Sequence, residues 1–298
     1  MRVSYTAGYY VELPPGHPFP MGKFPALHGI LRREGLVGDG DVVAPEPAPW
    51  ADLALVHTSE YLEALEAGAL GRRAERTVGL PWSAQLVQRS RLAVGGTVQA
   101  ARLALEDGVA ANLAGGTHHA FPGHGEGFCV LNDVAVAVRL LAGEGGIKRA
   151  LVIDLDVHQG NGTAAALAGS AAGYTFSMHG ERNFPFRKER SDLDVGLADG
   201  TADGAYLEAL DRYLPVALRQ AGPDLAFYLA GVDPLAGDRY GRLALSRAGL
   251  EERDRRVLSH LRQRGLPAVL LMSGGYAATP AATADLHATA HRVAAALY

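Results

Sequence analysis

Two side chains of metal-binding type stand two positions apart, directly after an apolar run. Asp156 and His158 follow Ala150–Asp154, which has the composition of a buried strand. At an extended strand end, residues i and i+2 point to the same side, so both side chains could contact one ion. Asp233 follows a second apolar run, Leu225–Ala230, and could supply a third ligand. Three protein ligands leave one position open for water and substrate, which is typical of a catalytic zinc site.

The acidic residues of this segment favour a bound cation. Asp154 and Asp156 lie together at the mouth of a buried strand, where two carboxylates repel each other and lose hydration. A metal ion relieves both effects. Zinc fits this set of ligands, and ferrous iron, cobalt or manganese could also fit. The single cysteine, Cys129, excludes a zinc site built from several cysteines and any disulfide within the chain.

Other residues of the chain are suited to acid–base chemistry. His118 and His119 follow the pair Gly115–Gly116, where the backbone can turn tightly and bring imidazoles near a ligand. Histidine titrates close to neutral pH, where proton transfer is most useful. Tyr276 follows Ser273–Gly275, and its hydroxyl could stabilise an oxyanion by roughly 3 kcal/mol. Taken singly, these could also be histidines of a surface loop and a tyrosine of the core.

Two aromatic segments could form the walls of a binding slot. Gly127–Cys129 and Phe184–Phe186 both carry phenylalanine beside glycine or proline. Flat apolar walls suit the methylene stem of a lysine and exclude water. As isolated motifs, both segments would more often serve the packing of the core.

The chemistry-bearing residues need a scaffold, and the pattern of the chain predicts one. Short apolar runs alternate with amphipathic stretches, which indicates βαβ units and a parallel sheet flanked by helices. The expected strands are Arg2–Tyr5, Leu53–Val56, Val109–Leu113, Ala150–Asp154, Tyr174–Ser177, Leu225–Ala230 and Ala268–Met272. The expected helices are Ser59–Ala67, Ser83–Glu106, Asn132–Ala142, Thr163–Ala168, Ala205–Gln220, Arg247–Arg264 and Ala281–Ala296. In such sheets ligands bind beyond the carboxyl ends of the strands, where four of these runs are followed by glycine-flanked polar residues.

Two segments are irregular in sequence. Pro14–Pro25 contains five prolines and is not expected to form an ordinary helix or central strand. Arg182–Asp203 mixes charges, prolines and glycines and is expected to form an exposed loop. Neither segment has the character of a linker, so residues 1–298 are expected to form a single catalytic domain.

The composition excludes several classes of function. The net charge is -4, whereas a general nucleic-acid-binding protein would be strongly basic. No run of apolar residues is long enough to span a membrane, and the N-terminus lacks the apolar region of a secretory signal. Together with the single cysteine, these features lead us to expect a cytoplasmic protein.

The motifs together resemble the histone deacetylase superfamily, which shares its fold with the arginases. The resemblance covers nearly the whole chain. It lies in Gly-Gly-Thr-His-His (115–119), Gly-Phe-Cys-x-Leu-Asn-Asp (127–133), Asp-Leu-Asp-Val-His-Gln-Gly-Asn-Gly (154–162), Ala-Gly-Val-Asp-Pro-Leu-Ala-Gly-Asp (230–238) and Ser-Gly-Gly-Tyr (273–276). The Asp-x-His-Gln-Gly-Asn-Gly form, with His17–Phe19 and Gly237–Arg239, is most similar to class IV and its bacterial relatives. The resemblance implies one three-layer α/β/α domain with a mainly parallel eight-stranded sheet.

The same resemblance implies a role for each site residue. Asp156, His158 and Asp233 match the zinc ligands of the family, and Tyr276 matches its catalytic tyrosine. His118 and His119 match the tandem histidines of the family, and His119 is the expected general base. Asp154 is expected to orient His118, and Asn161 is expected to orient His119. The expected lining of the substrate tunnel is Gly127, Phe128, Phe184 and Tyr240. A potassium ion is also implied, with ligands from Asp154, Asp156, His158, Ser177 and Met178.

The function that follows is a zinc-dependent amidohydrolase that removes acetyl or longer acyl groups from acyl-lysine in proteins or peptides. The alternative substrate is a small acylated amine such as an acetylpolyamine. An arginase-like ureohydrolase would need further aspartates for a two-manganese cluster, and these are missing from the pattern. A non-catalytic acyl-lysine binding module would not need His118, His119 and Tyr276, yet all three are present.

Overall fold

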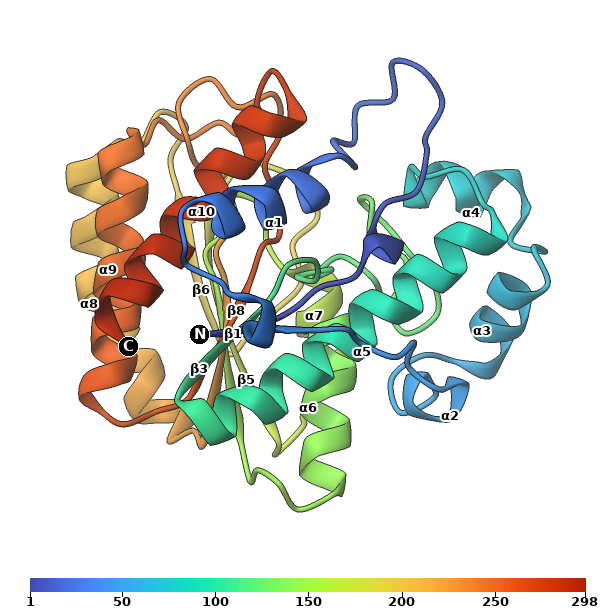
Figure 1. Cartoon of the computed structure of the whole chain (residues 1–298), viewed down its shortest axis with the longest axis horizontal. Coiled ribbons are helices and arrows are strands. Elements are labelled where there is room, and N and C mark those ends of the chain that lie inside the picture. Colours follow the sequence, from blue (N-terminus) through green and yellow to red (C-terminus); the bar gives the residue numbers. More distant parts are fainter.

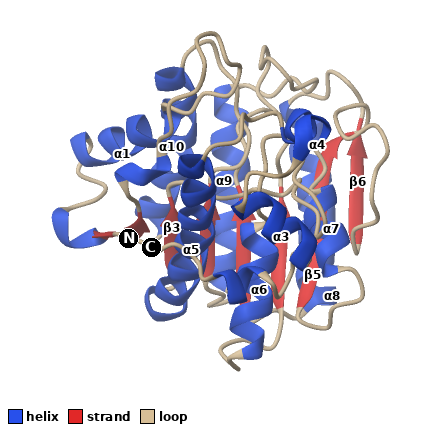
Figure 2. Ribbon diagram, turned by 90° about the vertical axis from the view of Figure 1, so that its right-hand side faces the viewer, coloured by secondary structure: helices blue, strands red, loops and turns tan.

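The computed structural model describes residues 1–298 and is built around one eight-stranded parallel sheet (Figure 2). The strands are β1 (Arg2–Ser4), β2 (Val42–Val43), β3 (Val109–Asn112), β4 (Ala150–Asp154), β5 (Gly173–Gly180), β6 (Leu193–Leu197), β7 (Leu225–Leu229) and β8 (Ala268–Leu271). Their order across the sheet is β2-β1-β3-β8-β7-β4-β5-β6, and every neighbouring pair is parallel. The expected α/β fold class is confirmed.

Helices cover both faces of this sheet (Figure 1). The α-helices are α1 (Lys23–Arg33), α2 (Trp50–Leu53), α3 (Ser59–Glu66), α4 (Gly71–Val78), α5 (Ala84–Asp107), α6 (Asp133–Gly143), α7 (Asn161–Leu167), α8 (Asp203–Ala221), α9 (Arg247–Gln263) and α10 (Pro280–Leu297). One apolar cluster joins the sheet to α1, α8, α9 and α10, and a second joins it to α5, α6 and α7. The result is the three-layer α/β/α arrangement.

The central strands are apolar throughout because each of their two faces meets a layer of helices. In β4, Leu151 and Ile153 belong to the first apolar cluster, whereas Val152, between them, belongs to the second. The same alternation holds in β8, where Leu270 and Val269 face opposite layers. Side chains of a strand alternate between its faces, so burial on both sides produces a continuous apolar run.

The four strands expected to end in polar residues are neighbours. In the sheet they lie in the order β3-β8-β7-β4, so their carboxyl ends meet at the centre of one edge. The loops that follow them carry the segments 113–132, 155–160, 230–246 and 272–279. The sheet therefore brings together four segments that are far apart in sequence.

A group of short helices lies beside this edge. Helices α2, α3 and α4 pack on the first half of α5 through a third apolar cluster, which includes Tyr61, Leu65 and Val94. Figure 1 shows these three helices at the right of the molecule. They bring the C-terminal turn of α4 close to the loops of the sheet edge, because the N–H groups of Gly127 and Phe128 donate to the carbonyls of Thr77 and Val78.

One expected strand is wrong. Leu53–Val56 contains the last residue of α2 and the turn that follows it. Pro49 precedes the helix, and Leu53 is buried in the third apolar cluster. An apolar run of four residues is too short to distinguish a strand from a turn of helix by its pattern.

The segment Arg182–Asp203 is only partly a loop. It contains β6, an edge strand in which Val195 and Leu197 are buried while Asp194 and Gly196 are exposed. Aspartate and glycine disfavour strands, which hides the alternating pattern. The interpretation of this segment as wholly irregular is corrected.

The last residues of the proline-rich segment Pro14–Pro25 form the start of a helix, which was not expected. Helix α1 begins at Lys23 and includes Pro25, and the sequence pattern did not predict it. The first turn of a helix has no intrahelical partner for its N–H groups, so a proline there breaks no hydrogen bond. Pro14–Pro20 is irregular, as expected.

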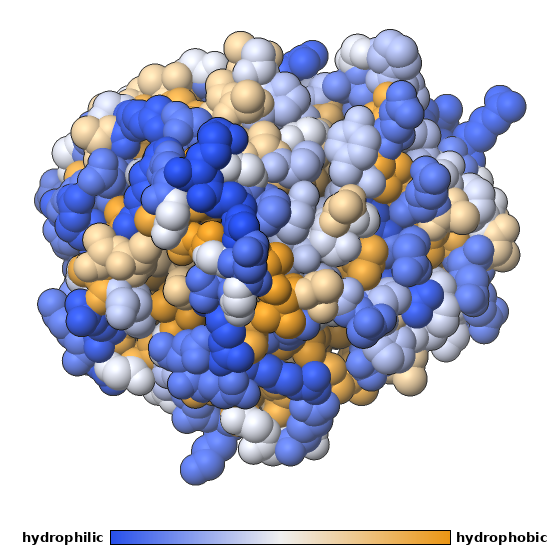
Figure 3. All heavy atoms as spheres, viewed as in Figure 1, coloured by the Kyte–Doolittle hydropathy of each residue, from blue (hydrophilic) through white to orange (hydrophobic).

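Hydrophilic residues cover most of the face in Figure 3, with a band of apolar residues visible between them. Among the helices of the structure, none has the length and apolar character needed to cross a bilayer.

Candidate active site

Three buried side chains with metal-binding atoms converge at the centre of the sheet edge. Asp156 and His158 follow β4, and Asp233 follows β7. Their ligand atoms all lie within 4.8 Å of one another. His158 Nδ1 lies 3.0 Å from Asp156 Oδ1 and 3.2 Å from Asp233 Oδ2. The three residues singled out from the sequence therefore surround one common centre.

The electrostatics of this centre fit a cation. Although burial lowers it, the pKa of His158 is raised to about 10 by Asp156 and Asp233. Burial and the neighbouring Asp156 raise the pKa of Asp233 to about 7. Asp233 Oδ2 is buried and accepts no hydrogen bond. Two buried carboxylates with one oxygen unsatisfied call for a positive charge, which a divalent metal would supply.

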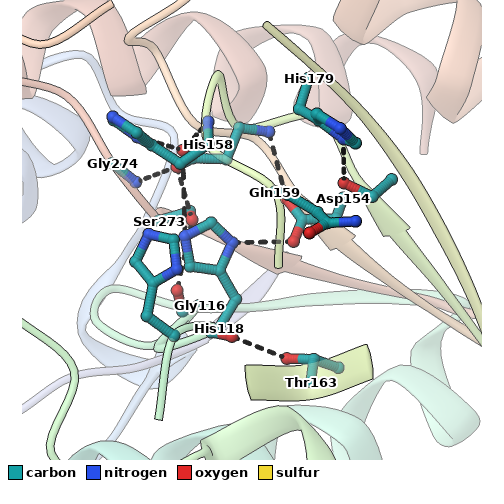
Figure 4. A network of polar contacts seen from close by, with 12 residues as sticks. Gly116, His118, Asp154, His158, Gln159, Thr163, His179, Ser273 and Gly274 are labelled. Atoms are coloured by element: carbon teal, nitrogen blue, oxygen red, sulfur yellow. Dashed lines mark hydrogen bonds and ion pairs between the residues drawn. The ribbon is translucent and has the colours of Figure 1, made fainter. Parts of the chain in front are cut away.

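Glycines surround the two carboxylates so closely that no other residue fits. The N–H of Gly274 donates to Asp156 Oδ2 at 2.6 Å, and Ser273 Oγ donates to the same oxygen at 2.8 Å. A methyl group at Gly274 would overlap Asp233 Oδ2 and would lie 2.6 Å from Asp156 Oδ2. Figure 4 shows Ser273 and Gly274, the two donors, beside His158. Their hydrogen bonds fix Asp156 and leave Asp233 Oδ2 available to an ion.

The tandem histidines lie beside this centre, and each is held at Nδ1 by a different kind of partner. His118 Nδ1 donates to Asp154 Oδ2 at 2.8 Å, an interaction visible in Figure 4. His119 Nδ1 lies 2.6 Å from Asn161 Oδ1. Their ring centroids are 4.1 Å apart. Since an amide oxygen only accepts hydrogen bonds, His119 carries its proton on Nδ1.

The surroundings shift the pKa values of the two histidines in opposite directions. Burial lowers the pKa of His118, but Asp154 and Asp156 outweigh it and raise the pKa to about 9. Burial, with the positive charges of His118 and His158, holds the pKa of His119 well below its usual range. His119 is therefore the neutral member of the pair, able to accept a proton.

The turn that carries the histidines depends on glycine and on a buried carboxylate. Gly115 and Gly116 have φ values of 77° and 78°, in the left-handed region that favours glycine. The Asp133 carboxylate, at the start of α6, accepts hydrogen bonds from the N–H groups of Gly116 at 2.9 Å and Thr117 at 2.7 Å. Asp133 is fully buried. It fixes the turn from which both imidazoles project.

An aromatic slot leads from the surface to these residues. The cavity has a volume of about 520 Å³, and His119 and His158 line it together with five aromatic side chains. These are Phe128, Phe184, Phe186, Tyr240 and Tyr276. The ring of Phe184 lies 5.0 Å from that of His119, and the rings of Tyr240 and Tyr276 are 4.9 Å apart. Gly127 also lines the slot, so the expected tunnel residues are brought together.

Backbone conformation and hydrogen bonds aim two of these aromatics. Phe128 has a φ of 66°, which is rare for a residue with a side chain and is maintained by its surroundings. The N–H of Tyr276 donates to Asp238 Oδ2 at 2.7 Å. Burial, reinforced by Asp233 and Asp156, raises the pKa of Tyr276 well above its usual range. The phenol is therefore protonated and can donate a hydrogen bond.

Residues expected to bind potassium lie beneath this centre. Asp154 on β4 and Ser177 on β5 are direct partners across the sheet, and Met178 follows Ser177. Ser177 Oγ lies 2.9 Å from His179 Nδ1. The set is buried and adjacent to Asp156 and is therefore compatible with a cation near the carboxylates.

Comparison with known proteins identifies the family. The family pattern described as "Histone deacetylase domain" matches residues 17–292. The chain belongs to this histone deacetylase family. Histone deacetylase 2 of Arabidopsis thaliana is 34% identical over 93% of this chain and 74% of its own. An uncharacterised protein of Picosynechococcus is 48% identical over 99% of both chains.

A solved structure of the same family agrees with the fold. The crystal structure of an HDAC homolog complexed with SAHA superposes with a TM-score of 0.78, at 27% identity, over 97% of this chain and 83% of the other. Membership of the histone deacetylase family supports a hydrolase that removes acetyl groups from acetyl-lysine or acetylated amines. The class IV branch stays a prediction.

Two residues beside the histidines were missed from the sequence. Asp133 is the last residue of the motif at 127–133, but no function was predicted for it from the sequence. In the structure it accepts hydrogen bonds from the turn that carries the histidines. Glu126 Oε1 accepts a hydrogen bond from Asn161 Nδ2 at 2.9 Å. Its position immediately before Gly127–Phe128 is the only sequence signal that could have pointed to it.

Proposed function

We propose that this member of the histone deacetylase family is a metal-dependent amidohydrolase that removes acyl groups from the ε-amine of acyl-lysine in proteins or peptides. One observation carries the proposal: the Asp156–His158–Asp233 centre and the His119 imidazole lie together at the inner end of an open aromatic slot. As parts of the same proposal, residues 1–298 form one catalytic domain that works in the cytoplasm.

Asp156, His158 and Asp233 would hold the metal ion, for which zinc is proposed and ferrous iron is the alternative. When bound, a divalent ion there would act as a Lewis acid toward the amide carbonyl and lower the pKa of a nearby water. A potassium ion is proposed near Asp154 and Ser177, with the carbonyls of Asp156, His158 and Met178 as further ligands.

His119 acts as the general base and then as the general acid. Its Nδ1 proton faces Asn161 Oδ1, so the lone pair of Nε2 is available toward the slot. Its low pKa keeps it neutral until it takes a proton from the attacking water. It returns that proton to the leaving amine. His118 is oriented beside His119 by its hydrogen bond to Asp154 Oδ2.

Tyr276 stabilises the oxyanion. Because its phenol remains protonated, it can donate a hydrogen bond to the oxygen that becomes negative as the carbonyl is attacked. Such a donor is worth roughly 3 kcal/mol in the transition state. Phe128 and Phe184 would contact the methylene stem of the acyl-lysine. Gly127 has no side chain and would let the substrate come close to the backbone, and Tyr240 would contact it at the rim of the slot.

The test is a panel of acyl-lysine peptides with acyl chains of increasing length, assayed beside an acetylpolyamine. The chain is used as purified, after chelation, and after zinc or ferrous iron is added back. We expect peptide hydrolysis that chelation abolishes and metal restores. Hydrolysis of the acetylpolyamine alone would favour the small-amine substrate, and activity insensitive to chelation would contradict the proposal.

A further inference from the structure

The mouth of the slot is basic, although the chain as a whole is acidic. The net charge of the chain is -4. The charged residues that line the cavity outside the metal centre are Arg76 from α4, Arg182 from the β5–β6 loop, Arg242 and a single acid, Glu126. The net charge of the mouth is therefore positive, whereas the net charge of the whole chain is negative.

These positive charges are largely uncommitted. Neither Arg76 nor Arg182 forms an ion pair within the chain, and Arg242 reaches its only acidic partner, Asp199, at 3.4 Å. Glu126 is already engaged by the Asn161 amide. The arginines thus present their charge to whatever approaches the slot, since oppositely charged groups within the chain do not neutralise them.

The same rim carries an exposed aromatic side chain. Phe186 is 88% exposed and lines the mouth on the same loop as Arg182. A phenylalanine exposed at the mouth can pack on a group of the substrate that lies next to the acyl-lysine side chain. An extended peptide provides such groups on either side of its lysine, whereas a slender polyamine does not.

We propose that the substrates are acyl-lysines within acidic peptide segments, and that cationic acylpolyamines are disfavoured. The inference rests on the proposed function and specifies the substrate class of the same slot. Carboxylates next to the acyl-lysine would meet Arg76, Arg182 and Arg242, whereas the ammonium groups of an acylpolyamine would be repelled by them. Since these arginines are exposed, salt should weaken the preference.

The experiment compares acetyl-lysine peptides that differ only in the flanking residues, which are aspartate, serine or lysine, with N8-acetylspermidine as the polyamine. We expect kcat/KM to fall in the order aspartate, serine, lysine, by about tenfold overall at low ionic strength. The difference should lie mainly in KM and shrink in high salt. The double variant Arg76→Glu, Arg182→Glu should reverse the order, and Arg255→Glu on α9, outside the mouth, should not change it.

The possible failures are distinguishable. Equal rates for the three peptides, or a preference for lysine flanks or for the polyamine, would overturn the inference and leave a deacylase in place. Hydrolysis of none of the peptides would overturn the proposed function and this inference with it.

A second observation stands independently and concerns Glu126. The hydrogen bonds run from His119 Nδ1 to Asn161 Oδ1, at 2.6 Å, and from Asn161 Nδ2 to Glu126 Oε1, at 2.9 Å. Asn161 is buried, and the Glu126 side chain is 21% exposed at the edge of the slot. The glutamate thus has no hydrogen bond to His118 or His119, but it accepts one from Asn161, the residue that orients His119.

An amide has a donor end and an acceptor end, and only one orientation suits a general base. If the Asn161 amide were reversed, its NH₂ group would face His119 Nδ1 and force the imidazole proton onto Nε2, the nitrogen needed for proton transfer. A carboxylate only accepts hydrogen bonds, so Glu126 holds the NH₂ group toward itself. We infer that Glu126 is a positioning residue that selects the productive tautomer of His119 through Asn161.

A double-mutant cycle tests this inference. Glu126→Ala should lower kcat about tenfold with little change in KM, and Glu126→Gln, which keeps an acceptor, should recover most of the loss. In Asn161→Asp, the carboxylate offers two equivalent acceptor oxygens, so Glu126 has no preferred orientation of the side chain to select. In the Asn161→Asp background, Glu126→Ala should cost nothing, or should raise activity by removing a like charge.

An independent readout is the ¹⁵N spectrum of the histidine rings, in which His119 should be protonated at Nδ1 and become a mixture of tautomers in Glu126→Ala. The same loss of kcat from Glu126→Ala in both backgrounds would overturn the inference, because a merely structural role would not depend on the residue at position 161. An unchanged tautomer in Glu126→Ala would overturn it as well.

Discussion

The N–H of Gly274 donates to Asp156 Oδ2 at 2.6 Å, so the segment after β8 fixes a carboxylate that follows β4. The position has no room for a side chain, because a methyl group there would overlap Asp233 Oδ2. Strands β8 and β4 lie on either side of β7, so the segments that follow them contact Asp233, which follows β7. The arrangement of Asp156 and Asp233 therefore depends on the absence of a Cβ at position 274.

Gly274→Ala should therefore weaken metal binding, because Asp156 and Asp233 must move apart to admit the methyl group. We expect a loss of affinity of about tenfold or more, in line with changes to groups that orient metal ligands. Titration calorimetry with Zn²⁺ on metal-stripped protein measures it. Gly143→Ala is the matched control, since its added methyl group would meet no atom within 4 Å. Equal affinity of the two variants would contradict this account of Gly274.

Tyr276→Phe should lower kcat about a hundredfold while metal content and KM stay close to those of the unaltered chain. The variant removes only the phenol that would donate to the oxyanion, and it leaves the ring that packs near Phe128. Steady-state rates on an acetyl-lysine peptide test this. Tyr10→Phe, at a side chain that is half exposed, is the control for loss of a hydroxyl group. A kcat within a factor of about two of the original would remove Tyr276 from the chemistry.

The convergence of Asp156, His158 and Asp233 could be predicted from the sequence because it follows from local features of the chain. Asp156 and His158 follow a strand that is apolar on both faces, and Asp233 follows another. The rule that parallel strands present their carboxyl ends at one edge then brings the three together. No knowledge of side-chain packing is required for that step.

The features that were missed depend on contacts between segments far apart in the chain. Glu126 gains its role from Asn161, which lies 35 residues away, and Asp133 gains its role from a turn 16 residues before it. In β6, Asp194 and Gly196 are acceptable only because that strand is at the edge of the sheet. None of these arrangements leaves a periodic signal.

The fold should lose stability in mild acid, and His57 should be one cause. His57 is buried, its Nδ1 donates to the Phe121 carbonyl, and its Nε2 accepts from the N–H of Asn132. Burial lowers its pKa from 6.5 to about 4. The unfolded chain therefore binds a proton between pH 6.5 and pH 4 that the folded chain does not. Stability from this group is present above the unfolded pKa and is lost as the pH falls toward the folded pKa.

For His57 alone, the expected loss in the free energy of unfolding is about 2 kcal/mol between pH 7 and pH 5. Urea unfolding at a series of pH values measures it. His57→Gln, which keeps a donor and an acceptor but does not titrate, should be less stable at pH 7 yet show a shallower decline in acid. A decline as steep as that of the unaltered chain would show that His57 does not contribute.

The central claim is that one divalent ion, held by Asp156, His158 and Asp233, makes this chain a deacylase. The most direct measurement is acetate release from an acetyl-lysine peptide by metal-stripped protein as Zn²⁺ is added in small steps. We expect no release without metal, then a linear rise that ends at one ion for each chain, and no rise at any Zn²⁺ level for Asp233→Asn. Full activity of the stripped chain, or a rise that ends only at two ions for each chain, would contradict the account.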